Sequence, residues 1–114
     1  MSKYQLGEFE EIVMLTVAVL HGNAYGVSVK KAIEVSVARK VSVGALQSAL
    51  KRLERKGYLK SKDGDSSSER GGRPKRYYEI TASGKRAIEE TKEIRNELWN
   101  AIPKIVLDVK INYV

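Results

Sequence analysis

One continuous stretch decides the fold: Ser42-Val-Gly-Ala-Leu-Gln-Ser-Ala-Leu-Lys-Arg-Leu-Glu-Arg-Lys-Gly57. Its apolar residues recur at three- and four-residue steps, which predicts a helix with one buried face formed by Leu46, Ala49, Leu50 and Leu53. Ser42 is a good N-cap, and Gly57 is a residue type that commonly ends helices. We therefore expect an amphipathic helix that begins after Val41 and ends before Gly57.

A two-stranded hairpin is expected after this helix. Residues 58–62 are typical of a strand, and residues 63–74, rich in Gly, Ser and Asp, are typical of a loop. Residues 75–80 form the second expected strand. Its alternation places Tyr78 and Ile80 on one face and Tyr77 and Glu79 on the other.

Two helices are expected before the Ser42 helix. The first carries an apolar stripe with acidic residues in its first turns, and the stripe consists of Leu6, Phe9, Ile12, Val13, Thr16, Val17 and Leu20. The second spans about residues 25–37, with Val29, Ile33 and Val37 directed inward. Its β-branched residues lower its helix propensity, so tertiary packing must hold it.

A last helix is expected to begin at the cap Thr81. It carries apolar residues at Ile88, Ile94, Leu98, Trp99 and Ile102. Pro103 must kink or end this helix, because proline removes a hydrogen bond and collides with the preceding turn. The pattern leaves the conformation of residues 103–114 open.

Composition limits the class of protein. A chain of 114 residues has room for one domain, and the absence of cysteine excludes disulfides and thiolate metal sites. The longest apolar run, residues 12–20, is short for a membrane span, and no leader is visible after Met1. The expectation is a cytoplasmic protein without a cofactor or metal and without contact with a membrane.

The positive charge is concentrated in the middle of the chain. Residues 39–86 contain fourteen Lys and Arg against five Asp and Glu, a balance of +9, whereas the segments on either side each carry −1. A solvated surface would mix its signs along the chain. A concentrated basic segment is typical of a face that binds a polyanion.

Three helices followed by a hairpin with a basic, glycine-rich tip predict a mainly α fold with a small β-hairpin, a winged helix-turn-helix. The expected division is a DNA-binding domain at residues 1–80 and a dimerisation helix with its tail at residues 81–114. In such folds the third helix enters the major groove and the hairpin lies along the backbone or the minor groove. The expected DNA contacts are Ser42, Gly44, Gln47, Ser48, Lys51, Arg52, Arg70, Arg73, Lys75 and Arg76.

Each assignment has a simpler alternative. The basic residues of the Ser42 helix could form only a solvated face, but the second basic cluster in the hairpin favours contact with double-stranded DNA. Gln47 is the candidate for reading bases, although an exposed glutamine is commonly a plain surface residue. His21, the only histidine, is expected to be a helix-end residue.

Other functions remain as alternatives. An RNA-binding or ribosome-associated winged helix would need exposed stacking aromatics, for which Tyr77 is the candidate in the basic segment. A winged helix that binds protein partners would not need the +9 balance. For an enzyme, the chain lacks a set of catalytic residues that could act together. Adjacent carboxylate pairs such as Glu10-Glu11 lie on a helix, where neighbouring side chains do not converge on one point.

The ordered motifs resemble the PadR family of transcriptional regulators over roughly residues 4–90. They are Leu6-Gly-Glu-Phe-Glu-Glu-Ile-Val13, Tyr25-Gly26, Val41-Ser-Val-Gly44, Leu50-Lys-Arg-Leu-Glu-Arg-Lys-Gly57, Gly71-Gly-Arg-Pro-Lys-Arg-Tyr-Tyr78 and Thr81-x-x-Gly84. Where Gln47 stands, the family usually has tyrosine, so the base preference is expected to differ. The short C-terminal part resembles the subfamily that has one dimerisation helix.

The resemblance implies a homodimer that usually represses transcription, with dimer contacts from the last and first helices. The apolar residues of the last helix exceed what one small domain covers, which independently favours a second copy. The expected dimer interface comprises Phe9, Ile88, Ile94, Leu98, Trp99 and Ile102. Some family members respond to small aromatic ligands, and Trp99 is the candidate contact for a planar effector, unless it is a packed interface residue.

Overall fold

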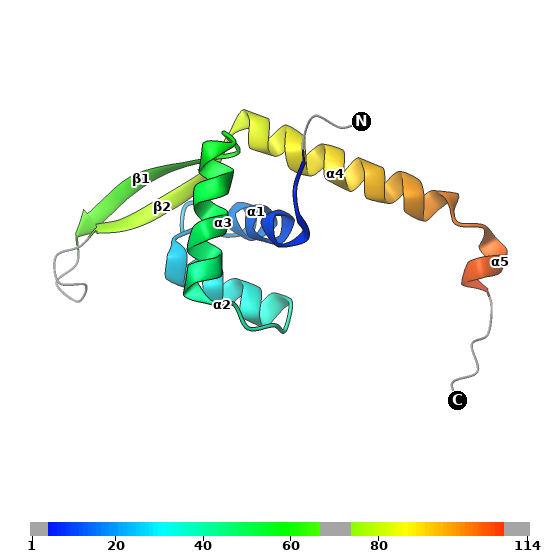
Figure 1. Cartoon of the computed structure of the whole chain (residues 1–114), viewed down its shortest axis with the longest axis horizontal. Coiled ribbons are helices and arrows are strands. Elements are labelled where there is room, and N and C mark those ends of the chain that lie inside the picture. The colour runs from blue at the N-terminus through cyan, green and yellow to red at the C-terminus, as the bar shows by residue number, and fades with distance from the viewer. Residues whose placement is uncertain (1–4, 67–73, 109–114) are drawn as a thin grey trace.

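The computed structural model describes residues 5–66 and 74–108. Its elements in chain order are α1 (Glu8–Val19), α2 (Gly26–Ser36), α3 (Val43–Arg55), β1 (Leu59–Ser66), β2 (Pro74–Ile80), α4 (Ala82–Ala101) and α5 (Lys104–Leu107). Figure 1 shows the first three helices packed together, with the hairpin at one end of the molecule and α4 projecting from the other. The predicted order of elements is confirmed. No helix in the described ranges is both long and apolar enough to cross a membrane.

The helix ends follow the expected local chemistry. Ser42 caps α3 by accepting a hydrogen bond from the Ala45 N–H at 3.0 Å, and Thr81 caps α4 by accepting one from the Gly84 N–H at 3.0 Å. After α3 the chain turns through Gly57, whose φ of +81° lies in the left-handed region that glycine adopts readily. Both predicted caps and the predicted end of α3 are confirmed.

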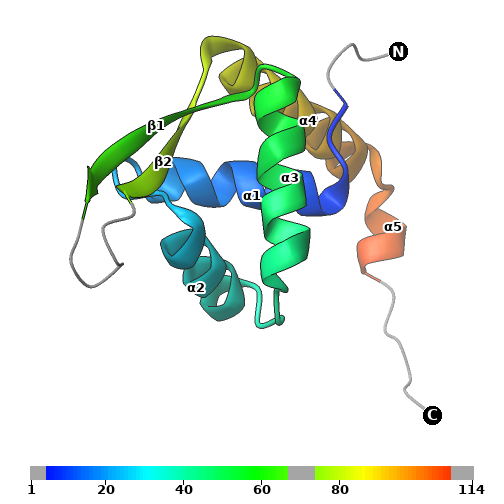
Figure 2. The ribbon, with the colours of Figure 1, turned by 60° about the vertical axis from the view of Figure 1, so that its left-hand side comes forward.

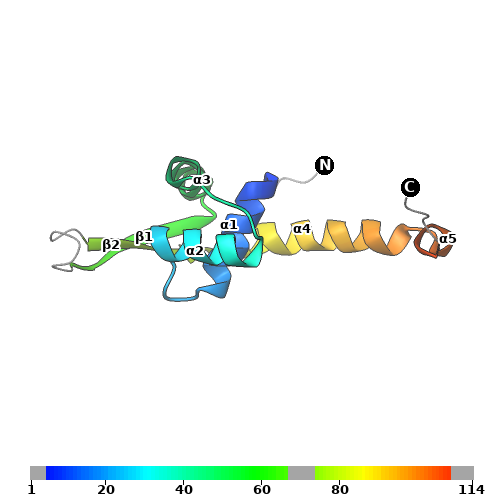
Figure 3. The ribbon, with the colours of Figure 1, turned by 90° about the horizontal axis from the view of Figure 1, so that it is seen from below.

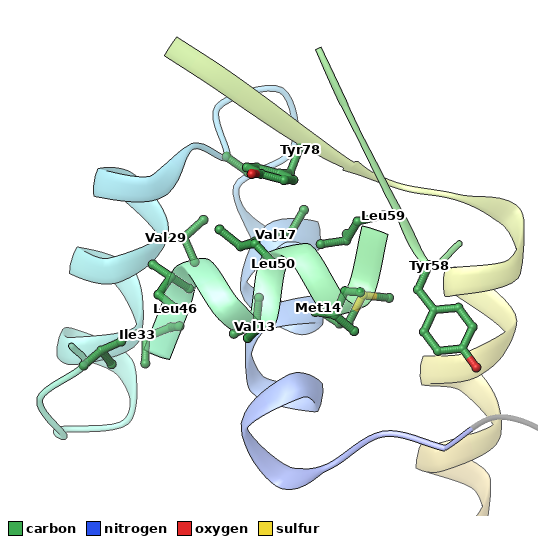
Figure 4. Close-up of a cluster of buried hydrophobic side chains, with 14 of the residues drawn as sticks. Val13, Met14, Val17, Val29, Ile33, Leu46, Leu50, Tyr58, Leu59 and Tyr78 are labelled. Carbon is green, nitrogen blue, oxygen red and sulfur yellow. The ribbon is translucent and has the colours of Figure 1, made fainter. Parts of the chain in front are cut away.

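The core lies between the three helices and the root of the hairpin (Figure 4). All four residues of the predicted α3 stripe are buried, and they meet Val13, Met14 and Val17 of α1. The prediction that Val37 faces inward is wrong, because α2 ends at Ser36 and Val37 is its C-cap with 40% of its surface exposed. The inward side of α2 is formed by Val29 and Ile33, as expected.

The hairpin is longer than the sequence predicts. Its antiparallel ladder pairs Leu59 with Ile80 at the root, reaches Asp63 and Arg76, and continues past an irregularity to Ser66 and Pro74. The prediction that the first strand ends at residue 62 is therefore wrong. Residues 63–66 have little strand propensity of their own, and Asp63 and Ser66 pair with Arg76 and Pro74 of β2.

Only the first turns of α4 belong to the core. Gly84 and Ala87 are buried, whereas every residue from Lys92 to Ala101 is exposed as the helix runs away from the other elements (Figure 1). The helix ends before Pro103, as predicted. Ile102 is extended, and the chain then forms the short helix α5, whose conformation the sequence left open.

Candidate nucleic-acid interface

The outer side of α3 is the most accessible helical surface of the three-helix unit. Because one side of α3 is buried, its other positions face away from the core. Figure 2 shows α3 in front of α1, and Figure 3 shows it standing out on one side of the molecule. The exposed positions include Gly44, Gln47, Ser48, Lys51 and Arg55. These residues come from the predicted DNA-contact set, except for Arg55.

The start of α3 permits close approach. A Cβ atom at Gly44 would meet no other atom within 4 Å, so the space beside this residue is open. The Ser42 hydroxyl is occupied by the Ala45 N–H and serves as the cap of its own helix. The first N–H groups of a helix have no partner within it and favour a phosphate.

Gln47 lies beside the start of α2. A Cβ atom at Gly26 would be only 3.2 Å from Nε2 of Gln47, so the absence of a side chain at Gly26 makes room for this amide. Gln47 is nevertheless exposed and one turn beyond the start of α3. Its amide thus lies next to the start of α2 and remains accessible from outside.

The basic residues of α3 and of its C-cap, Lys56, fall into two sets. Among the side chains that the structure describes, none forms an ion pair with Lys51 or Arg55, and both residues are exposed. Arg52 and Lys56 instead contact Glu10 of α1, with Arg52 Nε 3.3 Å and Lys56 Nζ 3.0 Å from its carboxylate oxygens. Sequence reasoning grouped Arg52 with the DNA contacts and did not anticipate its pairing with Glu10.

Glu10 is the one buried charged side chain in the described part of the chain. Burial raises the pKa of Glu10, but hydrogen bonds from the Gly7 N–H, Lys56 and Arg52, together with the charge of Lys56, outweigh it. The pKa of Glu10 is therefore below its ordinary value, and the carboxylate is charged at neutral pH.

We call the β1–β2 hairpin the wing. Its basic side chains also contact other residues of the protein. Arg76 Nη1 is 3.2 Å from Asp63 across the ladder, and Arg76 Nη2 is 4.0 Å from Glu54 of α3. Lys75 Nζ lies 4.3 Å from the centre of the Tyr25 ring. The predicted contacts Arg70 and Arg73 lie outside the described residues.

Tyr77 lies in the middle of the wing, where it pairs with Lys62. Its ring packs edge-on against Tyr25 with centroids 5.5 Å apart, and a Cβ atom at Gly64 would overlap it. Tyr25 and Tyr77 also form an isolated backbone bridge between the start of α2 and the wing. The aromatic residue considered for stacking on RNA bases is therefore half-buried against its own chain.

The predicted dimer residues lie in two environments. Leu98 and Trp99 are 67% and 62% exposed on the projecting part of α4, with Ile94 exposed between them and the core. Phe9 and Ile88 instead pack partly against the core, and the Arg39 guanidinium lies 5.3 Å from the Phe9 ring centre. Ile102 is half-buried at the end of α4.

Three packed helices, a paired wing and an outward, basic third helix define a winged helix-turn-helix protein of the DNA-binding type. The chain belongs to the PadR-like family of transcriptional regulators, whose family model matches residues 14–90. It is accordingly a DNA-binding transcriptional regulator and not an enzyme.

Solved structures agree with this membership. A PadR-like transcription factor from Bacteroides fragilis is 26% identical, with a TM-score of 0.70 over 85% of this chain and 88% of that one. A PadR family regulator from Eggerthella lenta is also 26% identical, with a TM-score of 0.67 over 90% of this chain and 88% of that one. Among curated protein sequences there is no match.

Proposed function

We propose that the protein is a homodimeric, sequence-specific repressor that inserts α3 into the major groove and lays the wing along the DNA backbone. The observation that carries the proposal is the outer side of α3, where Lys51 and Arg55 are unpaired within the described residues and Gly44 leaves open space. An α-helix fits the width of the major groove, and free cations gain affinity by releasing counterions from phosphates.

Residues on this face have separate roles in the proposal. Gln47 and Ser48 read base edges, because they are exposed in the first turns of α3. Lys51 contacts phosphate or a base one turn later. In the wing, the proposed contacts with the DNA backbone are Lys75 and Arg76, which belong to β2. Arg70 and Arg73 precede them in the same basic stretch of the sequence.

Dimerisation through α4 is supported by its exposed apolar residues. Ile94, Leu98 and Trp99 lie on a helix segment that has left the core, where such residues are commonly covered by a second copy. A groove of about 360 Å³ runs between α1 and α4, and its lining includes Leu15 and Ile88. We propose that residues 81–114 serve mainly for dimerisation and residues 1–80 for DNA binding.

The proposal is tested by a footprint of the purified protein over the DNA upstream of its own gene. A symmetric dimer is expected to protect two half-sites about 34 Å apart, one turn of the double helix, in a pseudo-palindrome. Occupying such a site in a promoter excludes polymerase, so transcription in a purified system should fall as the site fills. A single protected half-site would contradict the dimer, and unchanged or increased transcription would contradict repression.

A ligand response is the finer part of the proposal. Trp99 exposes its ring in the middle of the proposed interface, and planar aromatic compounds stack favourably on such a ring. Such a ligand changes DNA binding only if its affinity for the DNA-binding arrangement of the dimer differs from its affinity for an arrangement that does not bind DNA. Trp99 is the only tryptophan, so its fluorescence reports on this site. If planar aromatic compounds change neither its emission nor DNA affinity, Trp99 is structural.

A further inference from the structure

Glu10 holds Arg52 of the DNA-reading helix α3 and Lys56, the C-cap of that helix. Its Oε1 accepts hydrogen bonds from the Gly7 N–H at 2.9 Å and Lys56 at 3.0 Å, and its Oε2 accepts from Lys56 at 3.0 Å and Arg52 at 3.3 Å. Lys56 also donates to the Gln5 carbonyl at 3.2 Å. Only 7% of Glu10 is exposed, so a buried carboxylate neutralises these cations from inside the protein.

The two cations are nevertheless near the surface. The side chains of Arg52 and Lys56 are 46% and 38% exposed. Binding to DNA of arbitrary sequence is almost entirely electrostatic and grows with each phosphate that a cation neutralises. To reach a phosphate, Arg52 or Lys56 must leave Glu10, and an uncompensated buried charge is costly.

We propose that Glu10 limits the electrostatic, sequence-independent part of the DNA affinity: it withholds Arg52 and Lys56 from DNA phosphates. The proposal rests on the proposed insertion of α3 into the major groove. Contacts made by Gln47, Ser48 and Lys51 do not involve Glu10. Withholding the two cations therefore weakens binding to every sequence by a similar factor while the base contacts stay in place.

The neighbouring glutamate supplies a matched control. Glu11 pairs with Arg95 of α4, at 2.6 and 3.2 Å, and contacts no cation of α3 among the described residues. Glu10→Gln and Glu11→Gln change the net charge equally. They differ in whether cations of α3 are released.

The experiment measures the affinity of the full chain for a duplex of random sequence, by fluorescence anisotropy over a range of salt concentrations. If Glu10→Gln frees two cations per subunit, the slope of log K against log salt steepens by up to about 3.6 for a dimer. Affinity at about 0.1 M salt should rise at least tenfold. Glu11→Gln should change the slope by less than about 1. Equal slopes for the two variants, or weaker binding by Glu10→Gln, overturn the proposal.

A second pair of variants keeps Glu10 intact, in case Glu10→Gln does not fold. Lys56→Gln should leave the salt slope unchanged, whereas Lys51→Gln should make it shallower by about 1.8 for a dimer. An equal loss in both variants shows that Lys56 already contacts phosphate, and the proposal is then wrong. If the unchanged protein binds no duplex even at low salt, the proposed function fails as well, so the two failures are distinguishable.

Discussion

The backbone of Gly84, in the first turn of α4, lies directly against the carbonyl oxygen of Tyr58, just before β1. A Cβ atom at Gly84 would overlap this oxygen and also press on Met14 of the core. The same carbonyl accepts a hydrogen bond from the Thr81 N–H at 3.1 Å. The Thr81-x-x-Gly84 motif therefore joins α4 to the root of the wing.

Gly84→Ala should destabilise the protein, because the added methyl group forces two backbone segments apart. Overpacking of this kind costs on the order of 1–3 kcal/mol. The measurement is the free energy of unfolding in urea. Gly44→Ala is the control, since it also places a methyl group in the first turn of a helix but meets nothing within 4 Å. Equal stability of the two variants would contradict the close contact.

Ala38→Gly should stabilise the protein. Ala38 lies between α2 and α3 with φ of +54°, where an L-residue other than glycine loses roughly 1–2 kcal/mol. Glycine relieves this strain but gains entropy in the unfolded chain, so the net gain should be up to about 1 kcal/mol. Ala32→Gly, inside α2, should instead destabilise by roughly 0.5–1 kcal/mol. A loss of stability in Ala38→Gly would count against the left-handed conformation.

Operator binding should depend strongly on salt. If each subunit neutralises about four phosphates, a dimer neutralises about eight, and the slope of log K against log salt should be near −7. A slope shallower than about −2 would remove the electrostatic mechanism.

Arg73→Ala should weaken binding to all sequences alike, and Gln47→Ala should mainly change which sequence is preferred. A panel of operator variants separates the two effects.

The double variant Leu98→Glu, Ile102→Glu should be a monomer. The changes place charge on the exposed Leu98 of α4 and on its half-buried C-cap Ile102, where the charge would have to be desolvated in an interface. The first turns of α4 are untouched, so the winged helix should keep its fold and its circular dichroism. Light scattering at micromolar concentration gives the mass. A dimer of unchanged stability would show that another surface holds the copies together.

Acidification should weaken the joint between α1 and α3. The pKa of Glu10 is lowered in the folded protein, so its contribution to stability is full above the ordinary glutamate value of 4.5. That contribution is lost as the pH falls through the lowered folded pKa. The stability difference between the unchanged protein and Glu10→Gln should therefore be largest near neutral pH and shrink below pH 4.5. A difference that is constant across this range would exclude Glu10 as its source.

Local chemistry made most of the fold predictable. The Ser42 and Thr81 caps, the buried stripe of α3 and the helix end before Pro103 depend on residues close together in the chain. Interactions that depend on distant partners were missed. Residues 63–66 become a strand only because β2 pairs with them, and Arg52 meets Glu10 across 42 positions of the chain.

The candidate site was predictable in kind but not in detail. The concentration of charge indicated the basic face, and the amphipathic pattern indicated which residues of α3 point outward. Neither could show which cations have partners, because a charge count does not distinguish Lys51 from Lys56. The acidic start of α1 was the one sequence signal for such ion pairs. The sequence does not show, however, which helix Glu10 faces.

Consecutive residues of α1 anchor two different helices: Glu10 holds α3, and Glu11 holds α4 through Arg95. Successive positions on a helix point about 100° apart, so α1 can contact α3 and α4 at the same time. It thereby links the DNA-reading helix α3 to the projecting helix α4. In the proposed dimer, we therefore expect movement of one winged helix relative to the other to occur in the part of α4 beyond Arg95. The tolerance of this regulator for longer or shorter gaps between half-sites should accordingly be set by a few residues far from the DNA.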